Sequence, residues 1–224
     1  MAIKLKAPEI YLQSQSGYVS NLIVRGRLTD AKRIISAVAT EAKSLEMMDL
    51  HTEALVIQSN IALEQRDYLA GIHIGQAAIT YAPGQVARDL LLASIGGASV
   101  GYGDHDTAKK ILIPLSRRAQ GERVRQNALV NLLEVAAKDG DQPAFERYRQ
   151  KLDGTLTLPV IQAHYHLFLG KGYHNFGSVS KAIEEQQRAL AIADRYGLYQ
   201  ARATILDDPS VRALGHSRCV GEDL

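Results

Sequence analysis

The chain has 224 residues, of which 46% are hydrophobic and 22% are charged, and its formal net charge is +2. This is the composition of an ordinary globular protein, so it argues against long disordered segments and fibrous repeats. The near balance of charge gives no reason to expect nucleic acid or an anionic membrane as a partner.

The cysteine content and the hydropathy pattern bear on the compartment. A single cysteine, Cys219, cannot form an internal disulfide or a cysteine-based zinc site, which fits a reducing compartment. The first six residues carry two lysines and no apolar run, and the uncharged stretch between Asp89 and Asp104 has only 14 residues. We therefore expect a cytoplasmic protein without a signal peptide or a membrane span.

Helix-forming residues dominate the sequence, and alternating β-branched or aromatic runs are almost absent, which predicts an all-α chain. In chain order the apolar spacing predicts ten helices in five hairpins: 9–24 with 28–48, 50–65 with 68–82, 85–101 with 104–120, 122–139 with 141–153, and 158–175 with 178–196. A capping helix is expected near 198–206. We expect one domain over 1–206 and a flexible tail over 207–224.

Short breaks between the helical runs recur at a nearly constant interval. The five breaks begin at Gly26, Arg66, Gly103, Gly140 and Gly177. Successive breaks are 40, 37, 37 and 37 residues apart. A fixed period of this size predicts an array of helical hairpins, each of which contacts only its neighbours.

A small residue near the start of the second helix of a hairpin lets that helix lie close to the first. This position holds Ala31, Gly71, Ala108 and Ala182 in four of the five hairpins. The fourth hairpin departs from the pattern, since Phe145 occupies the position there.

These features resemble the tetratricopeptide repeat (TPR), most closely in the last hairpin. The residues that stand at the family's spacing there are Leu169, Gly170, Tyr173, Ala182 and Ala189, with His166 in place of its Trp and Asp194 in place of its terminal Pro. The period exceeds the 34 residues of that family and is similar to the extended repeats of MalT-like regulators and Rap- or PlcR-like peptide sensors. The resemblance implies a right-handed α-solenoid of about five TPR-like repeats with a C-terminal capping helix, and no catalysis.

The resemblance also implies a concave groove, lined by the first helix of each hairpin, that binds a peptide or a partner protein. The positions that it turns inward are Gln13, Ser16, Ser20, Glu53, Asn60, Glu64, Ser94, Gly97, Asn127, Asn131, Glu134, Lys138, His164, Lys171, His174 and Asn175. An asparagine amide both donates to and accepts from a peptide backbone, and a lysine suits an acidic group or a free carboxylate. The alternative is that these side chains only solvate an exposed groove.

One pattern suggests an enzyme. The run Gly97 to Gly101 matches the Gly-x-Ser-x-Gly nucleophile elbow around Ser99, but that motif needs a strand before it and a helix after it. The repeat register predicts a helix on both sides. A serine hydrolase is therefore the remote alternative, and close helix packing is the preferred explanation of the glycines.

Two further patterns suggest ligands. Metal ligands on one helix should be three or four residues apart, and the trio His164, His166 and His174 lacks that spacing, so no metal or cofactor is predicted. His166 is expected to pack between hairpins. The segment 109–125 is basic, but no helix-turn-helix or row of stacking aromatics accompanies it. A solvated helix face is expected there, and nucleic acid is not expected as a partner.

The main functional hypothesis is a non-enzymatic scaffold or regulatory module that binds a peptide or protein in its groove. The alternative is the ligand-sensing module of a MalT-like transcriptional regulator or signalling protein. No repeat precedes the first hairpin, so a homodimer through that hairpin is also expected. The face that would be left uncovered holds Ile3, Leu5, Ile10, Leu12 and Leu22.

Overall fold

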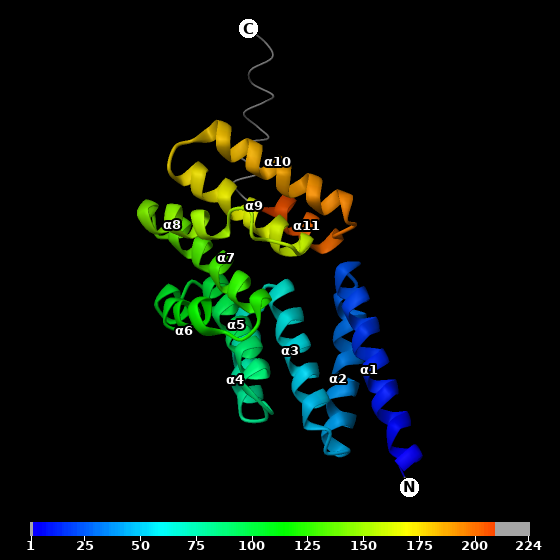
Figure 1. Ribbon diagram of the computed structural model, residues 1–224. Helices are drawn as coiled ribbons and strands as arrows, with labels where there is room; N and C mark the ends of the chain where they lie inside the picture. Colours follow the sequence, from blue (N-terminus) through cyan, green and yellow to red (C-terminus); the bar gives the residue numbers. More distant parts are fainter. Residues whose placement is uncertain (1, 209–224) are drawn as a thin grey trace. The chain divides into compact units, whose positions relative to one another are not determined.

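A computed structural model gives the fold for residues 2–208, with side chains from Pro8 onward. Within that range the protein consists of eleven α-helices and contains no strand, which confirms the all-α prediction. The fold is repeat-like, since consecutive helices pack against their neighbours (Figure 1). None of these helices is both long enough and apolar enough to cross a membrane. Most of the predicted tail over 207–224 lies outside the described residues, as does Cys219.

The chain forms two compact units, Met1–Ala128 and Leu129–Leu224. The first contains α1 (Ala2–Val24), α2 (Leu28–Ser44), α3 (Met48–Glu64), α4 (Tyr68–Ile79), α5 (Gln85–Tyr102), α6 (His105–Arg118) and the start of α7 (Glu122–Lys138). Each of α1 to α5 packs against the next helix along the chain, and α3 also contacts both α1 and α5. The first helices of the hairpins in this unit therefore form one layer.

The second unit continues from α7 through four more helices. They are α8 (Gln142–Leu152), α9 (Pro159–Asn175), α10 (Val179–Arg195) and α11 (Tyr199–Asp207). Helices α9 and α10 form a hairpin, and α11 packs against both of them. A helix is thus confirmed at the position predicted for the capping helix. The prediction that 1–206 form a single domain stays a prediction.

One turn geometry ends most of the helices. A residue with positive φ follows the helix, and the next amide donates to a carbonyl five residues back, as Met47 N–H does to Ala42 O at 2.9 Å. The positive-φ residues of these turns are Gly26, Glu46, Arg66, Gly103, Gly140, Gly177 and Gly197. The predicted end of the second helix at residue 48 is wrong. Helix α2 ends at Ser44, because the turn with Glu46 follows it.

Glu46 is strained, because it adopts φ 57° with a Cβ atom present. Left-handed backbone costs a non-glycine residue about 1–2 kcal/mol. We expect Glu46→Gly to raise the free energy of unfolding by about 1 kcal/mol, measured by urea denaturation and far-UV circular dichroism. The matched control is Glu41→Gly inside α2, which should lower it by about 0.5–1 kcal/mol. A lower stability for Glu46→Gly would contradict the strain.

Two residues of the predicted dimer face lie in the core of the first unit. Leu12 and Leu22 were expected on an uncovered surface, but they are 0% and 2% exposed in a cluster with residues of α2 and α3. They are buried because α2 folds back over that side of α1. Ile10 is exposed, as are Tyr11 and Tyr18. The side chains of Ile3 and Leu5 lie outside the described residues, and dimerisation stays a prediction.

The core of the second unit explains why the fourth hairpin has Phe145 where the other hairpins have a small residue. Phe145 is fully buried, and its ring edge lies over Gly172 of α9, where a Cβ atom would overlap the ring. At the corresponding position of the second hairpin, Gly71 lies against Leu63 of α3 and Ala98 of α5. A large residue is accommodated in the fourth hairpin because the facing helix supplies the small one.

Candidate functional site

The first unit contains an open hollow of about 830 Å³ between its helices. It lies beside α3 and is completed by the segment that opens α5, by the turn before α7 and the first turn of that helix, and by one residue of α1. The lining residues are Ser20, Asp49, Thr52, Glu53, Val56, Ile57, Asn60, Pro83, Gly84, Gln85, Val86, Ala87, Leu90, Gln120 and Arg123. A hollow of this size is in the range that holds a small ligand or a few residues of a peptide.

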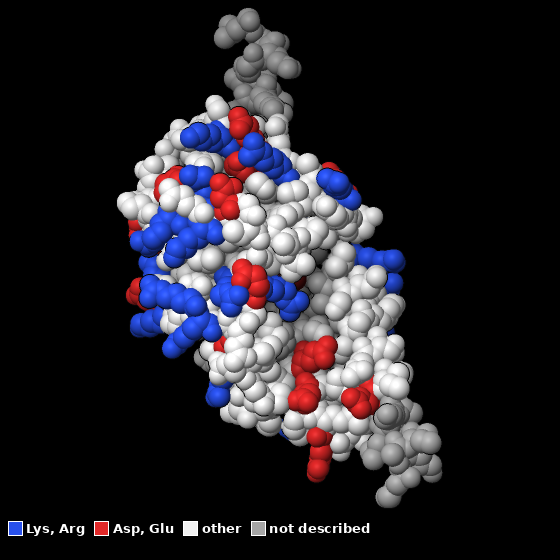
Figure 2. Space-filling view, in the orientation of Figure 1, with Lys and Arg blue, Asp and Glu red and all other residues white. Residues whose placement is uncertain are grey.

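The lining combines an apolar floor with charged and amide groups. Val56 and Ile57 of α3 and Leu90 of α5 are half-buried, while Val86 is 53% exposed. In the space-filling view, acidic side chains gather over α3 (Figure 2). An apolar floor with a few polar groups around it is typical of a binding site.

Two amide side chains in the hollow are held in place by hydrogen bonds. The carbonyl oxygen of Asn60 accepts a hydrogen bond from Ser94 Oγ at 2.9 Å, and the amide nitrogen of Gln85 donates to Asp89 at 2.7 Å. Each contact favours one orientation of its amide. The Asn60 nitrogen is left to donate to a ligand, and the Gln85 oxygen is left to accept from one.

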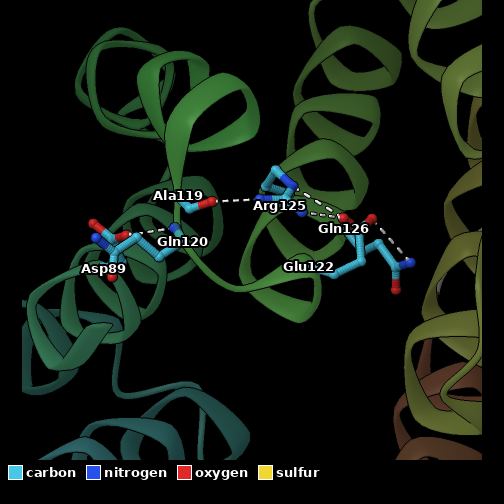
Figure 3. A network of polar contacts seen from close by, with 6 residues as sticks. All are labelled: Asp89, Ala119, Gln120, Glu122, Arg125 and Gln126. Atoms are coloured by element: carbon cyan, nitrogen blue, oxygen red, sulfur yellow. Dashed lines mark hydrogen bonds and ion pairs between the residues drawn. The ribbon is translucent and has the colours of Figure 1, made fainter. Parts of the chain in front are cut away.

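A buried carboxylate fixes the turn that forms one edge of the hollow. Asp89 is 3% exposed, and it accepts from Gln85 Nε2 and from the backbone N–H of Gln120 at 3.1 Å. Arg125 holds the same turn from the other side, since its guanidinium donates to the Ala119 carbonyl at 2.6 Å and to Glu122 (Figure 3). The turn carries Gln120 into the lining, and α7 begins there.

We expect Asp89→Ala to lower the free energy of unfolding of the first unit by about 1–3 kcal/mol, because the Gln120 N–H loses a part-buried hydrogen bond to a charged acceptor. Asp89→Asn should cost a similar amount, since one of the two donors would then face an NH2 group. Urea denaturation measures both, and Glu41→Ala on the surface of α2 is the control. Hydrogen exchange should rise at residues 119–121 in the Asp89 variants, and unchanged exchange there would contradict the role.

Several predicted groove residues come together in the second unit, where they bind one another. Lys171 Nζ lies 2.7 Å from Asp208 Oδ2 and 3.6 Å from Glu134 Oε1, and Lys138 Nζ lies 3.0 Å from Glu134 Oε1. The Lys171 side chain is 20% exposed, and its ammonium also stands over the Phe168 ring. Burial opposes the charge on Lys171, but Glu134 and Asp208 outweigh it and raise its pKa.

The other predicted residues of the second unit are distributed along α7 and α9. Asn175 Nδ2 donates to the Ala137 carbonyl at 3.0 Å, which joins α9 to α7. His164 stacks on Phe168, and His174 Nδ1 is buried without a hydrogen-bond partner among the described residues. Asn131 is half-buried on α7. Glu134, Lys138 and Lys171 thus lie together, and their charges are paired with one another and with Asp208.

In the first unit, Ser20, Glu53 and Asn60 line the hollow, and Ser94 binds Asn60. The remaining predicted positions do not line it: Gln13, Ser16, Glu64, Gly97 and Asn127. Asp89 and Arg123 were not among the predicted groove residues. The Pro83-Gly84 break marks a loop, but nothing in the sequence tells which helix face that loop closes.

The enzyme and metal patterns have structural explanations. Ser99 is 1% exposed inside α5 and donates to the Ile95 carbonyl at 2.9 Å, so the strained turn of a nucleophile elbow is absent there. His166 Nδ1 contacts Glu185 of α10 at 2.6 Å, a contact within the last hairpin, whereas packing between hairpins was predicted. The described residues contain no cluster of three or more metal-ligating side chains.

No protein-family model matches the chain, and no curated protein is significantly similar to it in sequence.

Proposed function

We propose that this protein is a non-enzymatic scaffold or regulatory module of the TPR-like type, with about five repeats in a right-handed α-solenoid, and that it binds a peptide segment of a partner protein. The binding site is the hollow of the first unit. The observation that carries the proposal is its lining, in which an apolar floor lies beside the oriented amides of Asn60 and Gln85.

This lining suits an extended peptide. A peptide backbone presents N–H and C=O groups in alternation, and the two amides offer one donor and one acceptor to them. The floor formed by Val56, Val86 and Leu90 would bury one or two apolar side chains. In peptide recognition of this kind, backbone hydrogen bonds commonly supply the affinity and side-chain pockets supply the specificity.

The paired charges of the second unit make it a weaker candidate. A ligand carboxylate that approached Lys171 would have to displace Asp208, which already binds its ammonium at 2.7 Å. We therefore assign Lys171, Glu134 and Lys138 to the stability of the second unit rather than to the ligand. The MalT-like alternative, a small molecule in the same hollow, is separated from a peptide by the experiment below.

The test is selection of random dodecamer peptides, displayed on phage, by the immobilised full chain. Synthetic copies of the selected peptides are then titrated by fluorescence polarisation. Val86→Arg should weaken their binding at least tenfold, because it places a guanidinium on the apolar floor at a position already 53% exposed. The matched control is Val179→Arg, at a position 46% exposed on α10, which should change nothing. Failure to select any peptide would refute the proposal, and thermal stabilisation by a small metabolite would favour the sensor.

A further inference from the structure

Two carboxylates without a cationic partner stand on the α3 side of the hollow. Asp49 and Glu53 are four residues apart, so they lie one helical turn from each other on the same face, and both are exposed and line the hollow. Neither forms an ion pair or a side-chain hydrogen bond with another residue of the described range 8–208. The one cation in the lining, Arg123, comes from α7.

We propose that the peptide taken by this hollow carries a lysine or arginine that contacts Asp49 and Glu53, next to an apolar side chain that packs on Val56, Ile57, Val86 and Leu90. The inference rests on the proposed function, and it adds the chemical class of the ligand. A guanidinium or ammonium is complementary to two neighbouring carboxylates, and none of the described residues forms an ion pair with either of them.

The placement of the charges relative to the floor gives the order of residues in the ligand. Val56 and Ile57 follow Glu53 by three and four residues, so they continue along the same face of α3 beyond the carboxylates. The basic residue therefore sits toward the start of α3, and the apolar residue sits toward Asn60. The amide nitrogen of Asn60 then lies where it can bind a backbone carbonyl of the ligand.

Other occupants fit the same charges less well. Nucleic acid would bring its phosphates against Asp49 and Glu53. A divalent metal ion needs more oxygen ligands than these two side chains offer, and no group of three metal-ligating side chains exists among the described residues. A small organic cation would use the carboxylates but would leave much of a hollow of about 830 Å³ unfilled.

The test reads the composition of the peptides selected by the full chain and by a charge-reversal variant. Wild type should enrich lysine or arginine within two or three positions of an apolar residue. The double variant Asp49→Lys, Glu53→Lys should lose affinity for those peptides at least tenfold and should instead enrich aspartate or glutamate. The matched control is Glu41→Lys, which changes the charge of an exposed residue of α2 outside the lining and should preserve the wild-type selection.

The outcomes separate this inference from the proposed function. Peptides selected without basic enrichment, or a selection that the double variant leaves unchanged, would overturn the inference while peptide binding stands. No selected peptide at all would remove the proposed function, and the inference with it. A fall in affinity for the basic peptides as salt rises would support the ionic contact, because exposed charges are screened. Far-UV circular dichroism of the variants confirms that they fold.

Discussion

Replacing Phe145 with alanine should lower the free energy of unfolding of the second unit by about 3–5 kcal/mol, the usual cost of truncating a buried phenylalanine. The Phe145 side chain is fully buried in a cluster formed by α7, α8 and α9. Its ring makes edge contacts with Tyr173 at 5.7 Å and Phe176 at 5.3 Å between centroids. Urea denaturation followed by far-UV circular dichroism measures the loss. Tyr196→Ala, at a half-exposed aromatic residue, is the control and should cost far less.

The same contact predicts a strong coupling between Phe145 and Gly172. Gly172→Ala should cost about 1–3 kcal/mol in the wild type, because the added methyl group overlaps the fixed ring. In the Phe145→Ala background the methyl group has room, and alanine is the better helix former, so Gly172→Ala should cost little or even stabilise the protein. A double-mutant cycle measures the difference. Additive costs would contradict the packing described here.

Replacing Lys171 with alanine should lower the free energy of unfolding by about 2–3 kcal/mol. The loss arises because the Asp208 carboxylate, which is only 12% exposed, would lose its ion pair with Lys171, while Glu134 would still have Lys138. Lys171→Met combined with Asp208→Asn should recover part of the loss, since it removes both charges and keeps the stem over Phe168. Lys32→Ala on the surface of α2 is the control. A loss as small as that of the control would contradict a structural role for Lys171.

The pH dependence of this cluster has a definite sign. Glu134 and Asp208 raise the folded-state pKa of Lys171 above its ordinary value of 10.5, against the effect of burial. The ionic stabilisation is therefore fully present at neutral pH and is lost as the pH rises through the folded-state pKa. Burial also raises the pKa of Tyr165 to about 12, which acts in the same direction. Stability should fall above about pH 10.5, and Lys171→Met should make that fall less steep.

The helices and the turns between them could be predicted from the sequence, because both depend on local interactions. Gly26, Gly103, Gly140 and Gly177 each adopt the positive φ that lets a chain leave an α-helix and start another. Asp104 then caps the next helix by accepting from the Thr107 amide. Arg66 adopts the same conformation without being a glycine, and the repeat interval alone revealed it. Glu46 was missed because neither its residue type nor the 37-residue interval marks it.

The candidate site was predictable only in part. Periodicity identified the inner faces of the first helices, and Ser20, Glu53 and Asn60 do line the hollow. Its other side is formed by residues 83–90 and by Arg123, which are distant in sequence and reach the site through contacts such as Asp89 with Gln120. A predicted face also does not reveal whether its charges are satisfied. Lys171 was expected to be available to a ligand, but Asp208 binds it from beyond α11.

The sequence by itself determined most of the helix boundaries, though not the turn at Glu46, and which helix faces are apolar, because a few neighbouring residues decide those properties through hydrogen bonding, φ preference and periodicity. The tertiary structure alone decided which side chains meet. It set Phe145 over Gly172, paired Lys171 with Asp208, and left Asp49 and Glu53 beside a hollow without a cationic partner among the described residues. The physical reason is that packing and charge pairing depend on residues far apart in the chain, whose distances are fixed only when the helices assemble.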